Sequence, residues 1–96
     1  MEKKIRFERT EQGSFYLAHN LEQSLRKLGG VKVGSIPWNE FSYNHEIYFL
    51  PKRNVVIDIG YSSSIYSITF FGYNKSIGEL EKILIDKHNL KNSILI

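Results

Sequence analysis

The sequence predicts an α+β fold, with an antiparallel sheet of three to five strands and two helices packed on one face. The strands are predicted from residues 45–73, where side chains alternate with the period of two that half-buried strands show. Two polar turns, residues 51–54 and 60–64, divide this region into three strands that pair with their neighbours. The helices are predicted from apolar side chains at helical spacing before and after it. Ninety-six residues without repeats indicate one globular domain, residues 1–96.

The first part of the chain predicts a strand, a helix and a second strand. Residues 3–8, KKIRFE, alternate charged and apolar side chains, as expected of a strand at a sheet edge. Ser14 is a residue type that favours a helix start, and Gly29 and Gly30 would end the helix. Its apolar face consists of Leu17, Ala18, Leu21, Leu25 and Leu28. Residues 31–35 can form a further short strand.

The three strands of residues 45–73 are expected to have two different faces. One face would carry Ile47, Phe49, Val55, Ile57, Ile59, Tyr66, Ile68 and Phe70. The other would carry Glu46, Tyr48, Leu50, Val56, Asp58, Ser67, Thr69, Phe71 and Tyr73. If both helices cover the first face, the second is open and unusually apolar, which would mark a partner surface or an oligomer contact. The alternative is that the N-terminal strand or the C-terminal tail covers it.

The last part of the chain predicts a second helix and an apolar tail. Ser76 and Glu79 match the capping box S-x-x-E, so we expect the helix to begin at Ser76 and to run to about His88. Its apolar face would consist of Ile77, Leu80, Ile83, Leu84 and Lys87. The tail ends in three apolar residues, 94–96, which we expect to pack on the domain or on a partner.

Residues 36–44 form the most aromatic loop of the chain. They include Trp38, the single tryptophan, together with Phe41 and Tyr43. Loops often carry functional residues, and tryptophan and tyrosine are favoured interface anchors. The alternative is that Trp38 and Phe41 fold back over an open end of the core.

Composition limits the classes of function. The net charge is +3, with 13 basic and 10 acidic residues dispersed along the chain, so charge alone does not argue for nucleic acid. The absence of cysteine excludes a disulfide scaffold and a thiolate zinc site, and suits a reducing compartment. The N-terminus has no apolar signal segment, and no run approaches the ~20 apolar residues of a membrane span. We expect a cytoplasmic protein that does not contact membranes.

No catalytic or metal-binding motif is present. The three histidines, His19, His45 and His88, do not have metal-ligand spacing. Asp58 is the one acid inside a predicted strand, where a solvated carboxylate or an ion-pair partner is expected more often than a general base. We therefore expect no metal, no cofactor and a protein that is not an enzyme.

Part of the chain resembles the small ribonuclease toxins of the HicA class. The resemblance lies in residues 44–51, NHEIYFLP, in residues 54–60, NVVIDIG, and in residues 77–84, IGELEKIL. It implies a fold like that of double-stranded RNA-binding domains and a catalytic histidine whose counterpart is His45. Tyr43-Asn44 stands where that family has Gly-Ser. For nucleic-acid contact the candidate cations are Lys52, Arg53, Arg26 and Lys27.

The leading hypothesis is a small non-enzymatic protein that binds another protein. Its partner-binding residues would be Trp38, Phe41, Tyr43, Tyr48, Phe71 and Tyr73. The many Ile, Asn, Lys and Tyr residues suit a phage or bacterial accessory protein, such as an inhibitor or an immunity-type protein. The alternative is a nucleic-acid-binding protein or a small ribonuclease toxin, in which His45 would be catalytic. A third hypothesis is a homo-oligomer assembled through the outer sheet face or the tail.

Overall fold

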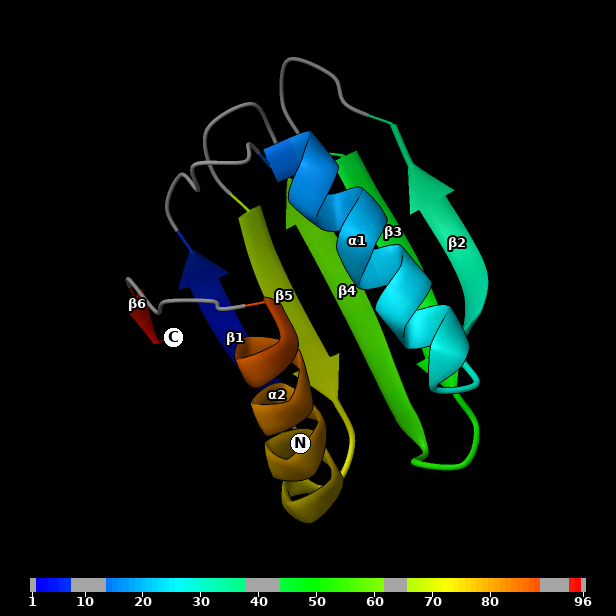
Figure 1. Ribbon diagram of the computed structural model, residues 1–96. Helices are drawn as coiled ribbons and strands as arrows, with labels where there is room; N and C mark the ends of the chain where they lie inside the picture. The colour runs from blue at the N-terminus through cyan, green and yellow to red at the C-terminus, as the bar shows by residue number, and fades with distance from the viewer. Residues whose placement is uncertain (1, 8–13, 38–43, 62–65, 89–93, 96) are drawn as a thin grey trace.

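The computed structural model describes residues 2–7, 14–37, 44–61, 66–88 and 94–95 (Figure 1). Its elements are β1 (Glu2–Phe7), α1 (Ser14–Lys27), β2 (Val31–Ile36), β3 (Asn44–Leu50), β4 (Val55–Tyr61), β5 (Tyr66–Phe71), α2 (Asn74–His88) and β6 (Ile94–Leu95). The predicted α+β class is confirmed, as are the predicted antiparallel sheet and the two helices. None of the described helices is both long enough and apolar enough to span a membrane.

The strands form one antiparallel sheet in the order β2-β3-β4-β5-β1-β6. The predicted meander is present as β3, β4 and β5. β1 lies between β5 and β6, so the expectation that it is an edge strand is wrong. β6 pairs Leu95 with Ile5 and Ile94 with Arg6, so this part of the tail packs on the domain. The tail thereby adds a strand that the alternation pattern does not predict.

Glycine ends α1 as the sequence predicts. Gly29 has φ 87°, in the left-handed region that glycine adopts at low cost. The Gly30 N–H donates to the Leu25 carbonyl at 2.8 Å, and the Gly29 N–H donates to the Arg26 carbonyl at 3.0 Å. These two bonds are those of a Schellman motif, and they turn the chain directly into β2.

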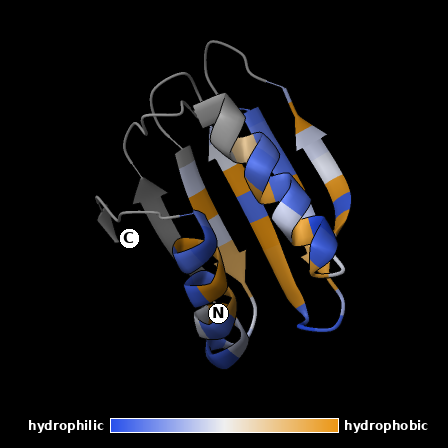
Figure 2. Ribbon diagram, in the orientation of Figure 1, coloured by the Kyte–Doolittle hydropathy of each residue, from blue (hydrophilic) through white to orange (hydrophobic). Residues whose placement is uncertain are grey.

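The core lies between the helices and one face of the sheet. Its buried side chains are Ala18, Leu21 and Leu25 of α1, Tyr48 and Leu50 of β3, Val55, Ile57 and Ile59 of β4, Ile68 and Phe70 of β5, and Ile77, Leu80 and Leu84 of α2. In Figure 1 both helices lie in front of the sheet. Figure 2 shows hydrophilic and hydrophobic bands alternating along both helices, as expected when one helical face is buried.

The predicted assignment of faces is wrong for β3. Tyr48 is opposite Ile57, and Ile57 is opposite Phe70, so these three residues share the helix-covered face. Ile47 and Phe49 therefore lie on the other face. Both alternating sets of β3 contain large apolar or aromatic side chains, so alternation alone cannot orient this strand. A shift of one residue in register exchanges every side chain between the faces.

The start of α2 also differs from the prediction. The Ile77 N–H donates to the Tyr73 carbonyl at 2.9 Å, and α2 begins at Asn74. Ser76 is therefore inside the first turn, and the predicted capping box does not mark the helix start. The buried residues of α2 are three of the five predicted, Ile77, Leu80 and Leu84, whereas Lys87 is exposed.

Candidate functional site

The face of the sheet opposite the described helices, called here the open face, is the candidate site. The register assigns to it Val31, Gly34, Ile36, His45, Ile47, Phe49, Val56, Asp58, Gly60, Ser67, Thr69 and Phe71. In Figure 1 it is turned away from the viewer. Four of its apolar residues lie toward one end of the strands, whereas Ile36 lies opposite His45 toward the other end.

Four apolar residues form a row across the open face. Val31 is opposite Phe49, Phe49 is opposite Val56, and Val56 is opposite Phe71. We call these four residues the apolar row. Its two ends are the most accessible, with Val31 49% and Phe71 40% exposed. Tyr73, which is 72% exposed, follows two residues after the end of the row.

The polar half of the open face contains a histidine–aspartate pair. His45 Nδ1 lies 2.9 Å from Asp58 Oδ1. An ionised carboxylate can only accept, so when the imidazole is neutral it donates from Nδ1 and keeps its lone pair on Nε2. An imidazole held in this way is an oriented base. Asp58 is therefore the hydrogen-bond partner of His45.

Gly60 makes room for this pair. It lies directly opposite His45 in the β3–β4 ladder. A Cβ at position 60 would lie 3.0 Å from His45 Cε1 and 3.2 Å from Ser67 Oγ. Glycine therefore allows the imidazole to lie over the neighbouring strand, beside the serine hydroxyl.

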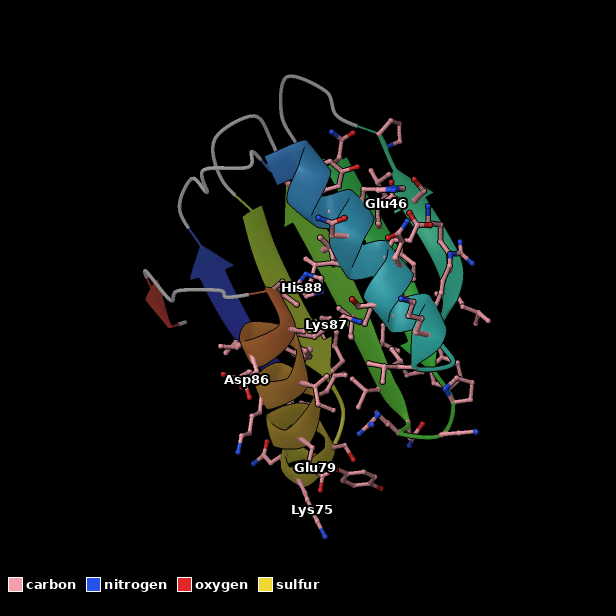
Figure 3. The ribbon with its side chains drawn as sticks, in the orientation of Figure 1. Glu46, Lys75, Glu79, Asp86, Lys87 and His88 are labelled. Carbon is pink, nitrogen blue, oxygen red and sulfur yellow. The ribbon has the colours of Figure 1, made fainter. Side chains whose placement is uncertain are left out.

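A network of ion pairs lies on the other side of the sheet, between α1 and strands β2 and β3. Lys32 Nζ is 3.0 Å from Glu46 Oε2 and 3.6 Å from Glu22 Oε1, and Arg26 Nη2 is 3.0 Å from the same Glu22 oxygen (Figure 3 labels Glu46). Burial opposes ionisation of Glu22, but the hydrogen bond from Arg26 and the charge of Lys32 outweigh it and lower the Glu22 pKa. Contact with Glu46 raises the pKa of Lys32 despite partial burial.

This network has a structural role. Its two cations and two carboxylates balance, and it ties α1 to the edge of the sheet. Beneath it, burial and then the negative charge of Glu22 raise the pKa of Tyr48 far above its ordinary range. The Tyr48 hydroxyl thus stays protonated and cannot serve as a base at neutral pH.

A serine–histidine pair joins the two helices. The distance between Ser24 Oγ and His88 Nε2 is 2.7 Å. Burial, and secondarily the charge of Lys87, lowers the pKa of His88. Ser24 is buried, so its hydroxyl has no access to a substrate, and the pair is a structural link rather than a nucleophile with its base.

The four cations proposed for nucleic-acid contact lie on two elements that meet at one end of the molecule. Arg26 and Lys27 are at the end of α1, and Lys52 and Arg53 are in the β3–β4 turn (Figure 1). Arg26 pairs with Glu22, and Arg53 Nη1 lies 3.8 Å from Glu79 Oε2. Half of this positive charge is therefore offset by neighbouring carboxylates.

The aromatic residues predicted to bind a partner differ in their positions and in their exposure to solvent. Trp38, Phe41 and Tyr43 lie outside the described residues. Tyr48 is 1% exposed, so its predicted place on an accessible face is wrong. Phe71 and Tyr73 are exposed, as that prediction requires. The missed part of the apolar row is Val31 and Phe49; their alignment with Val56 is visible only once the strand register is known.

No model of a known protein family matches the chain, and no curated protein matches it significantly.

Proposed function

We propose that the protein acts by binding another protein through the open face of its sheet. The observation that supports this proposal is the apolar row, whose end residues Val31 and Phe71 are accessible. An antiparallel sheet that faces water normally carries polar residues on that face. An apolar strip spanning four strands is instead typical of a surface that a partner covers.

The exposed surface of α2 is charged, unlike the apolar row. Lys75, Glu79, Lys82 and Asp86 are exposed along this helix, with both signs of charge interspersed (Figure 3 labels Lys75, Glu79 and Asp86). Such a mixed charged surface keeps a small domain soluble and offers no apolar anchor. The partner is therefore expected on the opposite side of the molecule, with Phe71 and Tyr73 as its aromatic contacts.

The test compares one substitution in the row with one on α2. Tagged wild-type protein, Phe71→Glu and Lys82→Glu are incubated with nuclease-treated lysate of the source cells, and bound proteins are quantified. We expect one stoichiometric protein to be retained by wild type and Lys82→Glu and lost by Phe71→Glu. Circular dichroism checks that all three are folded. Equal recovery on all three would refute the proposal.

The His45–Asp58 pair favours a second candidate function, cleavage of single-stranded RNA. In metal-independent cleavage, His45 Nε2 would take the 2′-hydroxyl proton while the 2′-oxygen bonds to phosphorus. The bond to the 5′-oxygen then breaks, and that oxygen takes a proton from water. In the β1–β5 ladder, Arg6 is opposite Ser67 and Lys4 is opposite Thr69.

Cleavage is tested on a labelled single-stranded RNA with a chelator present. If this candidate holds, wild-type protein and His19→Ala cleave the RNA, while His45→Ala does not. His19 is the matched control because it lies on α1, where it bonds Gln23 on the surface. Absence of cleavage by wild type, or equal cleavage by all three proteins, would exclude this candidate.

A further inference from the structure

β2 is an edge strand with exposed apolar side chains. Among the described residues it pairs with β3 alone, at the end of the sheet. Charged side chains at an edge normally discourage pairing with other chains. The one charged residue of β2 is Lys32, whose ammonium group is turned toward Glu46 and Glu22 beneath α1. Val33 is 59% exposed, and Val31 and Ile36 are also exposed.

A β-bulge in β2 places the side chains of its first and last residues on the same face of the sheet. In a regular strand, residues 31 and 36 would point to opposite faces, because their separation is odd. The register shift between Lys32 and Gly34 changes this. Val31 is opposite Phe49 and Ile36 is opposite His45, so both lie on the open face. Lys32 and Ser35, opposite Tyr48 and Glu46, lie together on the helix-covered face.

Two β2 strands with this arrangement of side chains are complementary to each other. Antiparallel pairing of two β2 edges about a twofold axis perpendicular to the sheet can place Val31 opposite Ile36 of the partner subunit. In the same register Lys32 is opposite Ser35 of the partner subunit, and Val33 is opposite Gly34 of the partner subunit. Apolar residues then meet apolar residues on the open face, and the two lysines stay apart. Without the bulge, this register would set residues of opposite faces against each other.

We propose that the protein forms a twofold dimer in which the two β2 edges pair and join the sheets into one. The molecule that pairs with this edge is a second copy of this chain, because Val31 matches Ile36, and Lys32 matches Ser35, in the face of the sheet on which they lie. The dimer leaves both open faces accessible on the same side. It therefore does not depend on the protein-binding function proposed above and would present two such surfaces together.

The first test is the mass of the purified protein in solution, measured by light scattering over a range of concentrations. We expect twice the mass of one chain for wild type and for Phe71→Lys, and the mass of one chain for Val33→Lys. Val33→Lys places two ammonium groups beside the axis, whereas Phe71 lies three strands from the edge. Loss of the dimer in Phe71→Lys but not in Val33→Lys would mean that open faces stack, and a monomeric wild type would also overturn the proposal.

The second test fixes the register by cross-linking and is independent of the charge substitutions. The chain has no cysteine, so introduced cysteines are the only thiols. The double variant Val31→Cys/Ile36→Cys should form a covalent dimer under mild oxidation, since each cysteine faces the other position in the partner. Each single variant should not, because equivalent residues would lie roughly 16 Å apart, beyond the reach of a disulfide. Equal cross-linking of single and double variants would overturn the register.

Discussion

Ser24 Oγ and His88 Nε2, 64 residues apart in the chain, lie 2.7 Å from each other and connect the two helices. Ser24 is buried in α1, and His88 is the last residue of α2. The bond therefore fixes the end of α2 against α1 at the place where the chain leaves the helix. Two predictions follow from this bond. Stability should depend on pH through His88, and removal of the Ser24 hydroxyl should destabilise the protein.

Stability should decrease as the pH falls through about 6.5, the ordinary pKa of histidine. Burial lowers the His88 pKa in the folded state, so the unfolded chain binds this proton more readily. The free energy of unfolding is then highest above pH 6.5 and falls until the folded-state pKa is passed. Urea unfolding between pH 8 and pH 5 measures this decrease. His88→Gln should reduce the slope and His19→Gln should not; an unchanged slope in His88→Gln would contradict the assignment.

Removing the Ser24 hydroxyl should destabilise the protein by about 1–2 kcal/mol, since a partly buried imidazole nitrogen then loses its partner. The variant is Ser24→Ala, and denaturant unfolding measures the change. Ser35→Ala provides the control, because Ser35 is exposed on β2 and its substitution should change stability by less than about 0.5 kcal/mol. Equal effects of the two substitutions would show that the bond between the helices contributes nothing.

A methyl group at position 60 should break the His45–Asp58 pair. In Gly60→Ala the new Cβ would lie 3.0 Å from His45 Cε1, so the imidazole must shift, and we expect this shift to separate it from the carboxylate. We expect a loss of about 1 kcal/mol or more from this crowding. Gly34→Ala is the matched strand control, because its Cβ would meet Ile47 Cδ1 at an ordinary 3.6 Å, and it should be neutral or slightly stabilising.

Nuclear magnetic resonance of the His45 ring separates this effect from general destabilisation. In wild type and Gly34→Ala, the ring nitrogens should report a proton held on Nδ1. In Gly60→Ala that signature should be lost while the rest of the sheet remains. Retention of the signature in Gly60→Ala would mean that the imidazole adapts without leaving Asp58.

The sequence predicts the order of elements well because each of them carries a local signal. Helical spacing in α1 and α2, alternation in β4 and β5, and two glycines after α1 all act over a few residues. The site depends instead on register, which is not local. His45 and Asp58 are 13 residues apart and meet because the β3–β4 ladder brings them to the same face. The apolar row requires three such ladders, one between each pair of neighbouring strands from β2 to β5.

Substitution of Tyr48 tests which face of β3 points toward the helices. If it were a partner-binding residue on an open face, as the sequence suggested, Tyr48→Ala would weaken binding and leave stability nearly unchanged. With the ring 1% exposed beneath α1, the same substitution should instead cost about 3–5 kcal/mol, because it leaves a large cavity in the core. Tyr73→Ala is the control: this ring is 72% exposed, so we expect less than about 0.5 kcal/mol. Denaturant unfolding measures both variants, and a mild effect of Tyr48→Ala would mean that β3 has the opposite face toward the helices.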